Sequence, residues 1–329
     1  TYIATWLAVT CVGAKIVPVE PDPNTYNLDS NKLKIAITKN TKVVIAVHLY
    51  GLPANVKDIL EICVPYGIKV LEDAAQAHGA KSNGMQVGGL GHAAAFSFYP
   101  SKNLGALGDA GAITSNDVDL IDKIRSIRNY GSTQKYFNDH CGYNSRLDEL
   151  QAAFLSIKLK YLDKNNQTRR EIANIYNNEM SEIKQIKLPD SFKYTDSVWH
   201  LYVMRVEQRM ELIDFLAKQG VETLIHYPLP PHLQKAYKSL QLPKKSFPIS
   251  ESIHEEVLSL PIGPHLSMKD IKYIWLSFAF IGISLYLSGV QGINFQYFWP
   301  NSIWWATFSV PLFVNLGYIP VLLYCRLFI

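Results

Sequence analysis

One lysine, Lys102, lies between an apolar run and a cluster of glycines in FSFYPSKNLGALGDAG, residues 96–111. A lysine that is withdrawn from water loses basicity, and its neutral amine can then act as a nucleophile. Such amines most often form Schiff bases, including the one with pyridoxal phosphate (PLP). The glycines that follow, Gly105, Gly108 and Gly111, permit either a tight turn or a close backbone approach to a ligand. An ordinary solvated lysine beside a turn is the alternative.

PLP makes further demands that the sequence can be tested against. The pyridinium nitrogen needs a carboxylate, and Asp73 in VLEDAAQAHGA ends an apolar run, where an ionised carboxylate needs a cationic partner. In a helical turn, Gln76 would lie on the same face as Asp73, and its side chain could hydrogen-bond the phenolic oxygen of the PLP ring. Ser97 offers a hydroxyl to the phosphate. Taken singly, Asp73 is as well explained as a helix cap and Ser97 as a small strand residue.

These residues need a sheet that brings them to one edge. Short apolar runs predict strands, and an amphipathic run with a closing glycine predicts a helix at 56–67. This alternation indicates an α/β fold with a mostly parallel sheet covered by helices. In such sheets ligands bind beyond the carboxyl ends of the strands, where Asp73 and Lys102 would both lie. The expected strands are 14–20, 41–50, 68–74, 92–99 and 110–115.

The rest of the chain predicts a second, smaller unit. Residues 116–186 have a helical pattern, and a strand, a helix and a strand follow at 199–206, 211–220 and 221–227. We therefore expect a large PLP-binding domain at 1–165 and a small C-terminal α/β domain at 166–274. A hydrophobic tail follows at 275–329.

Composition narrows the class of protein. The 329 residues carry a formal net charge of +4 without a basic stripe, which argues against nucleic acid as a partner. The cysteines are far apart and form no CxxC, so the sequence predicts neither a metal site nor a disulfide framework, and a reducing compartment fits. They are Cys11, Cys63, Cys141 and Cys325.

The tail has a membrane-like composition. Residues 273–325 contain no Asp, Glu, Lys, Arg or His, and two runs within them have the 18 or more apolar residues typical of a transmembrane helix. Lys269 and Lys272 before the first run and Arg326 after the second fit a hairpin with both ends in the cytoplasm. The alternative is a segment joined to an enzyme by frameshift, rearrangement or misassembly.

The motifs EDAAQAHGA, FSFYPSKNLGALGDAG, RNYGS and GYNSRLDELQAA, in this order, closely resemble the DegT/DnrJ/EryC1/StrS family of PLP-dependent sugar aminotransferases. The resemblance extends from residue 1 to about 274. It implies the aspartate-aminotransferase fold (PLP fold type I), normally a homodimer with active sites at the subunit interface.

The resemblance also assigns residues. Lys102 matches the Schiff-base lysine, Asp73 the partner of the pyridinium nitrogen, Gln76 the contact to the ring oxygen and Ser97 a phosphate ligand. Relatives with histidine at the lysine position are dehydratases, so lysine favours transamination. Two further positions complete the cofactor site: Tyr2 as the aromatic ring stacked on the cofactor and Asn144 as a phosphate contact from the neighbouring subunit.

The implied reaction takes an amino group from a donor, glutamate in the family, and gives it to a ketosugar. The segment IHYPLPPHLQKAY, residues 225–237, resembles family members that aminate dTDP-3-keto-6-deoxyhexoses. His226, Tyr227 and His232 are the candidate substrate contacts, and the alternative is a proline-stiffened loop packed on the core. Two other readings stay open: an aminotransferase for a non-nucleotide ketone such as a cyclitol, and a catalytically impaired fragment or fusion.

The ends of the chain differ from the family pattern. The family has a further N-terminal segment before the position of Thr1, so we expect the sequence to lack that segment. We expect a cytoplasmic enzyme of amino-sugar synthesis for surface glycans such as O-antigen or lipopolysaccharide. A genuine tail would tether it to the inner membrane through residues 273–325.

Overall fold

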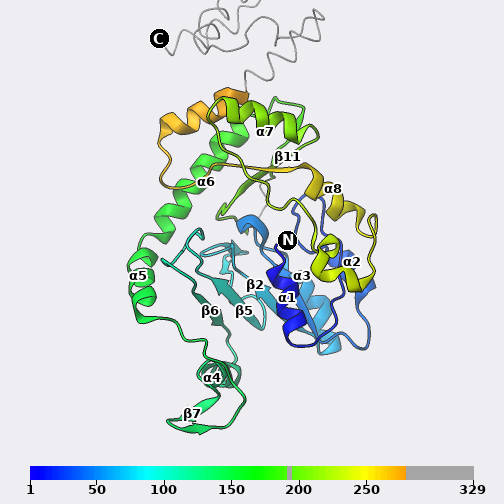
Figure 1. Ribbon diagram of the computed structural model, residues 1–329, viewed down its shortest axis with the longest axis vertical. Coiled ribbons are helices and arrows are strands. Elements are labelled where there is room, and N and C mark those ends of the chain that lie inside the picture. Colours follow the sequence, from blue (N-terminus) through cyan, green and yellow to red (C-terminus); the bar gives the residue numbers. More distant parts are fainter. Residues whose placement is uncertain (191–194, 279–329) are drawn as a thin grey trace, which may run out of the picture. The chain divides into compact units, whose positions relative to one another are not determined.

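The computed structural model describes residues 1–190 and 195–278 (Figure 1). The chain divides into two compact units, Thr1–Tyr273 and Ile274–Ile329, and only residues 274–278 of the second are described. The architecture that follows is that of the first unit.

The main sheet has four strands in the order β1-β2-β5-β6. β1 (Val43–Val47), β2 (Lys69–Asp73) and β5 (Ala93–Ser97) are parallel, and β6 (Gly111–Thr114) pairs antiparallel with β5. The expected mostly parallel sheet is therefore confirmed. Its register sets Asp73 between Val47 of β1 and Ala95 of β5, so the carboxylate residue lies at the carboxyl edge.

The sequence explains why these segments form sheet and helix. The run VVIAV of β1 is rich in β-branched residues, and Val44, Ala46 and Val70 are buried in one core cluster. α3 (Val56–Cys63) begins where the Asn55 side chain accepts a hydrogen bond from the backbone of Asp58, and it packs Ile59 into the same cluster. Each buried valine or isoleucine of this cluster contributes about 1.5–3 kcal/mol on burial.

Among the other helices of the first half of the chain, α4 stands apart from this core (Figure 1). α1 precedes the sheet in the chain, α5 and α6 lead from it to the second half, and Figure 1 shows α4 with the β7–β8 hairpin projecting together from the body. The hairpin strands are β7 (Ser132–Gln134) and β8 (Phe137–Asn138). The helix bounds are α1 (Ala4–Cys11), α2 (Ser30–Ala36), α4 (Val118–Ile127), α5 (Glu149–Leu159) and α6 (Leu162–Glu179).

A second, antiparallel sheet follows in the order β12-β11-β9. Its strands are β9 (Ile186–Lys187), β11 (Tyr202–Val206) and β12 (Val257–Leu260), with helices α7 (Arg209–Lys218) and α8 (Pro248–Glu256) between the last two. A third, small sheet joins β10 (Thr195–Asp196), β3 (Lys81–Ser82) and β4 (Met85–Gln86).

Three sequence predictions of secondary structure were wrong. Residues 14–20 form an extended segment, whose proline at position 18 has no N–H to donate, and its neighbourhood makes only the isolated bridge Pro21–Leu28 among the described residues. Residues 221–227 make a single bridge, Leu224–Ser259, before the prolines that follow. Residues 116–186 are not helical throughout, because the β7–β8 hairpin interrupts them.

The tail predictions fall almost wholly on residues 279–329, which lie outside the described residues. Over the parts that the structure does describe, 1–190 and 195–278, none of the helices has the length and apolar character needed to cross a bilayer. The domain boundary expected at residue 165 falls within α6 and stays a prediction.

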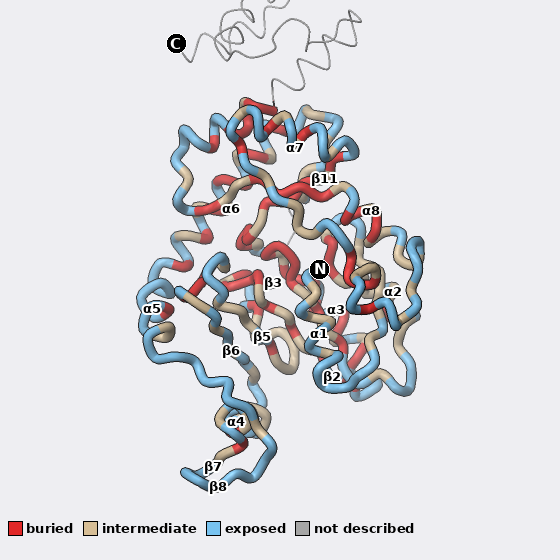
Figure 2. The backbone as a smooth tube through the Cα atoms, viewed as in Figure 1, coloured by how far each residue is buried: buried red, intermediate tan, exposed pale blue. Residues whose placement is uncertain are grey.

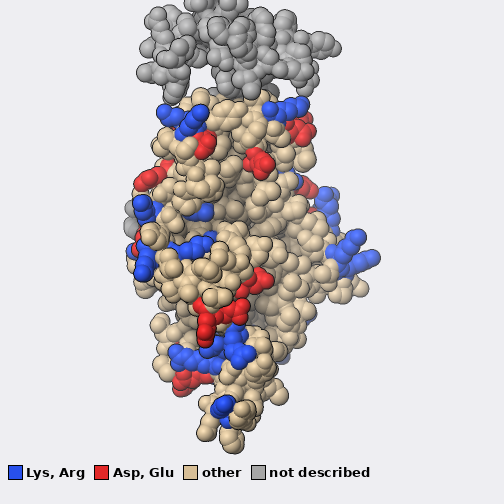
Figure 3. Space-filling view, turned by 60° about the vertical axis from the view of Figure 1, so that its left-hand side comes forward, with Lys and Arg blue, Asp and Glu red and all other residues tan. Residues whose placement is uncertain are grey.

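Side-chain exposure and charge vary over the surface. Figure 2 shows β11 almost wholly buried, buried residues alternating with partly buried or exposed ones in β2, and mostly exposed residues in β6, β7 and β8. On the face shown in Figure 3, lysine and arginine side chains alternate with aspartate and glutamate rather than forming a broad patch of one sign.

Candidate active site

Lys102 lies on the loop between β5 and β6, at the carboxyl end of the sheet. Hydrogen bonds from Phe98 N–H to Ala110 O (2.8 Å) and from Ala106 N–H to Phe98 O (2.7 Å) close the base of this loop. A Cβ at Gly105 would lie 2.4 Å from the carbonyl oxygen of Pro100, so the turn has room only for glycine. The loop is therefore compact and holds Lys102 at a fixed place.

The electrostatic surroundings of Lys102 favour a reactive amine. Burial lowers the pKa of Lys102, and the negative charge of Asp73 opposes that shift. Burial also lowers the pKa values of three histidines, and the charge of Lys102 lowers each of them further: His78, to about 4, His200 and His226. The lysine amine thus has one carboxylate and three neutral imidazoles near it.

Asp73 is held by two donors at the end of β2. The Thr5 hydroxyl of α1 donates to Oδ2 at 2.7 Å, and the Ala75 N–H donates to Oδ1 at 3.2 Å. These bonds fix the plane of the carboxylate. Thr5 was missed in the sequence because nothing in its local pattern indicates a partner 68 positions away.

Gln76 is buried and uses both ends of its amide. Its Oε1 accepts from the Tyr50 N–H at 2.6 Å, and its Nε2 donates to the hydroxyl oxygen of Tyr227 at 3.0 Å. The amide nitrogen has a second proton, which leaves one donor for a ligand. The Tyr227 ring in turn lies 5.4 Å from the ring of Tyr2, centroid to centroid. The structure thus brings together Gln76, Tyr227 and Tyr2, three of the predicted site residues.

Asn103, the neighbour of Lys102, ties the loop to distant parts of the chain. Its Nδ2 donates to Asn166 of α6 and to the carbonyl of Val198, each at 2.9 Å. Its Oδ1 is then the acceptor of the 3.1 Å bond to His200, so the imidazole carries its proton on Nδ1. Nothing in the local sequence pattern distinguishes Asn103 from the turn residues around it.

The other predicted residues occupy different surroundings. Ser97 ends β5, and its Oγ accepts from the Tyr99 N–H at 3.3 Å. His226 bonds Ser259 Oγ through Nδ1 at 2.8 Å. His232 is buried against Glu251, with 3.1 Å from Nε2 to Oε1, and lines a hollow of about 900 Å³. Asn144 is exposed and accepts from Arg146, and within residues 1–190 and 195–278 no recorded contact links it to Lys102.

These groups fit PLP by the chemistry of the donor set. The amine corresponds to the cofactor's aldehyde, and the carboxylate with fixed orientation corresponds to its ring nitrogen. The amide donor corresponds to the phenolic oxygen, the hydroxyl to the phosphate and the aromatic ring to the ring face. Together with the sheet, they define an α/β enzyme site for PLP-dependent amine chemistry.

Comparison with known proteins agrees with this class. The sequence matches the DegT/DnrJ/EryC1/StrS aminotransferase family over residues 1–278, and the chain belongs to this family. Members of this family are PLP-dependent aminotransferases, as the sequence resemblance predicted. Residues 265–329 match a second family, described as 7TM diverse intracellular signalling.

Two of the relatives are named as transaminases of dTDP-linked aminodeoxysugars. The chain is 54% identical to the dTDP-3-amino-3,6-dideoxy-alpha-D-galactopyranose transaminase of Aneurinibacillus thermoaerophilus, over 83% of this chain and 75% of the relative. It is 48% identical to the dTDP-3-amino-3,4,6-trideoxy-alpha-D-glucose transaminase of Streptomyces venezuelae, over 81% and 70%. The crystal structure of S. venezuelae DesV superposes with a TM-score of 0.83 at 46% identity, over 84% and 75%.

Proposed function

We propose that the protein transfers an amino group from glutamate to the 3-keto carbon of a dTDP-linked 6-deoxyhexose, with PLP held at Lys102. The observation that carries this is the placement of Lys102 and Asp73 at one edge of the sheet, in a chain 54% identical to a dTDP-3-amino-sugar transaminase. Bound PLP supplies an electron sink, through which an amine leaves a donor and later joins a ketone.

The chain's own residues would orient the cofactor. Asp73 would pair with the ring nitrogen, and the bonds from Thr5 and the Ala75 N–H hold its carboxylate in place. Gln76 offers its second amide proton to the phenolic oxygen, and Tyr2 covers one ring face. Ser97 gives its hydroxyl to the phosphate.

Lys102 would both hold the cofactor and move protons. As a free amine, its Nζ would remove the proton from the α-carbon of the bound amino donor. The lowered pKa of Lys102 keeps a larger fraction of this amine neutral and basic near pH 7. The neutral histidines around it do not compete for that proton, because burial lowers their pKa values.

The absorption spectrum of the full chain with PLP tests the proposal. A visible band that Lys102→Ala removes and glutamate bleaches is expected, followed by recovery on addition of the dTDP-3-ketosugar. A folded protein without a lysine-dependent band would overturn the proposal and favour the catalytically impaired fragment or fusion. Recovery with a cyclitol ketone but not with the sugar nucleotide would reassign the acceptor.

A homodimer is part of the same proposal. The segment from β7 to α5 exposes large apolar side chains, with Tyr136 85%, Tyr143 70% and Leu150 73% accessible, more than isolated surface residues would explain. A second copy seated there would cover them and bring Asn144 toward the neighbouring phosphate site. Light scattering of the full chain should give a molar mass of twice the chain mass. The Leu150→Glu variant should give the mass of a single chain.

The tail and the compartment complete the proposal. The enzyme would act in the cytoplasm and be tethered to the membrane through residues 273–325. We therefore expect the full chain to stay with the membrane pellet through a high-salt wash. Recovery in the supernatant would remove the tether and leave the aminotransferase proposal untouched.

A further inference from the structure

Four residues from three parts of the chain form a closed circuit of hydrogen bonds beside the candidate site. The Tyr50 N–H donates to Gln76 Oε1, and Gln76 Nε2 donates to the Tyr227 hydroxyl oxygen. The chain then runs back from Tyr227 to His226, whose carbonyl oxygen accepts the hydroxyl proton of Tyr50. Tyr50 therefore forms hydrogen bonds both to Gln76 and to the dipeptide His226–Tyr227.

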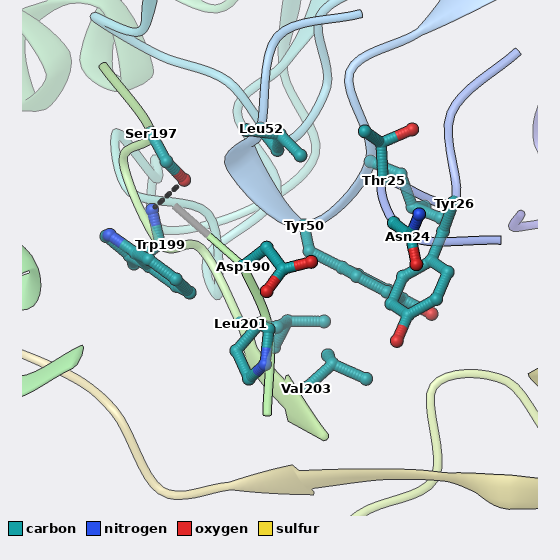
Figure 4. Close-up of a pocket in the computed structure, with 12 residues that line it drawn as sticks. Asn24, Thr25, Tyr26, Tyr50, Leu52, Asp190, Ser197, Trp199, Leu201 and Val203 are labelled. Carbon is teal, nitrogen blue, oxygen red and sulfur yellow. Dashed lines mark hydrogen bonds between the residues drawn. The ribbon is translucent and has the colours of Figure 1, made fainter. Parts of the chain in front are cut away.

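Tyr50 is built into a rigid position. It follows the carboxyl end of β1 in the short turn Leu49–Gly51 and has φ = 59°, in the left-handed region that β-carbon residues seldom adopt. A Cβ on the next residue, Gly51, would lie 2.9 Å from the backbone nitrogen of His200. The turn therefore packs closely against the backbone around His200. Figure 4 shows the Tyr50 side chain extending from this turn beside Tyr26.

The dipeptide that Tyr50 holds carries two of the candidate substrate contacts. Ser259 Oγ bonds the His226 ring at 2.8 Å, so the dipeptide is fixed from both sides. The Tyr227 hydroxyl accepts from Gln76 and keeps its own proton to donate. Burial raises the pKa of Tyr227 and lowers that of His226, which leaves both side chains neutral at physiological pH.

We infer that Tyr50 is a positioning residue for the acceptor: its hydroxyl and N–H together hold His226 and Tyr227 in the positions from which they contact the keto sugar. The inference rests on the proposed function, because it assigns the two side chains to the acceptor rather than to glutamate. Loss of the Tyr50 hydroxyl frees the carbonyl of His226 while Gln76 keeps its bond to the backbone of Tyr50.

Tyr50→Phe in the full chain with PLP tests this on the two half-reactions. The rate at which glutamate bleaches the lysine-dependent band should stay within about twofold of that of the unmodified chain. By contrast, kcat/KM for the dTDP-3-ketosugar should fall about tenfold, which is the effect of one lost hydrogen bond near a reacting group. Tyr26→Phe is the matched control, since Tyr26 is a neighbouring tyrosine of similar burial, 6% against 9% exposed. Equal loss in both half-reactions, or equal loss in the control, would overturn the inference.

Hydrogen exchange of the protein without cofactor supplies a readout that does not depend on activity. Tyr50→Phe should speed amide exchange in a peptide covering residues 224–229 relative to the unmodified chain, and Tyr26→Phe should not. Unchanged exchange there would contradict the circuit even if the acceptor half-reaction slowed. If the unmodified chain shows no lysine-dependent band, the proposed function is wrong. The exchange experiment would still decide whether Tyr50 holds the dipeptide His226–Tyr227.

Discussion

The hydroxyl of Thr5 donates a hydrogen bond of 2.7 Å to Oδ2 of Asp73, and so α1 orients the carboxylate at the end of β2. The Ala75 N–H occupies the other oxygen at 3.2 Å. The charge that must face the cofactor's ring nitrogen is therefore placed by two donors rather than by the strand alone.

Replacement of Thr5 by alanine should weaken PLP binding. The carboxylate would lose one of its two fixed donors and rotate more freely, which we expect to raise the Kd for PLP about three- to tenfold. Titration by absorbance measures the change. Thr5→Ser keeps the hydroxyl and should restore most of the affinity; an alanine variant that binds as tightly as the unmodified protein would show that the bond orients nothing.

The pKa of Lys102 should respond to Asp73 in a defined direction. Burial lowers it below the ordinary 10.5, and the charge of Asp73 raises it again, so Asp73→Asn should lower it further. The pH dependence of reductive methylation at Lys102, followed by mass spectrometry in PLP-free protein, gives the midpoint. A midpoint that rises in Asp73→Asn would mean that the two groups are not coupled as the structure indicates.

Glu72 should contribute stability that acid removes. Burial raises its pKa, but hydrogen bonds from His48, Gly88 and Gly91 outweigh this and leave the pKa below the ordinary 4.5. Because the folded state holds the proton more weakly than the unfolded state, the contribution is present above about pH 4.5 and is lost as the pH falls through the lowered value.

Urea unfolding of Glu72→Gln at pH 7 and at pH 4 measures this contribution. The variant should lose about 3 kcal/mol at pH 7, since it leaves buried donors without their charged acceptor, and the loss should shrink at the lower pH. Glu61→Gln is the surface control, because the Glu61 side chain is 65% exposed. A loss that does not depend on pH would assign the effect to packing instead of charge.

A methyl group at Gly105 should displace the lysine loop. The new Cβ would lie 2.4 Å from the backbone carbonyl oxygen of Pro100, and no side-chain rotation can relieve that contact. We expect Gly105→Ala to cost about 1–3 kcal/mol and to reduce the lysine-dependent PLP band. Gly89→Ala, whose nearest contact would be 3.8 Å away, should change neither thermal unfolding nor the band.

The elements that carry local patterns were predictable from the sequence. β1, β2, β5 and β6 follow apolar runs, α3 follows an amphipathic run, and the predicted parallel strands led to Lys102 and Asp73 at one sheet edge. The segment 14–20 was mispredicted because an apolar run becomes a strand only beside a partner strand, and pairing is a long-range property.

The site residues that sequence reasoning missed share the same cause. Thr5, Tyr50 and Asn103 act through bonds to residues 68, 176 and 63 positions away, and a polar residue in a turn or helix does not reveal such a partner. His232 shows the converse: its buried pairing with Glu251 favours a packing role, which the sequence alone left open beside substrate contact. Its assignment to the substrate stays a prediction.

The bonds of Asn103 have a consequence for how the protein reaches its native state. Its partners on α6 and at Val198 and His200 lie 63 to 97 positions along the chain, so the Asn103 side chain anchors the lysine loop only after those regions have come together. Contacts of such separation carry a large loop-closure entropy and form late in folding. The cofactor would then recognise only the finished structure, and PLP added during refolding should raise the yield of native protein without accelerating the early steps.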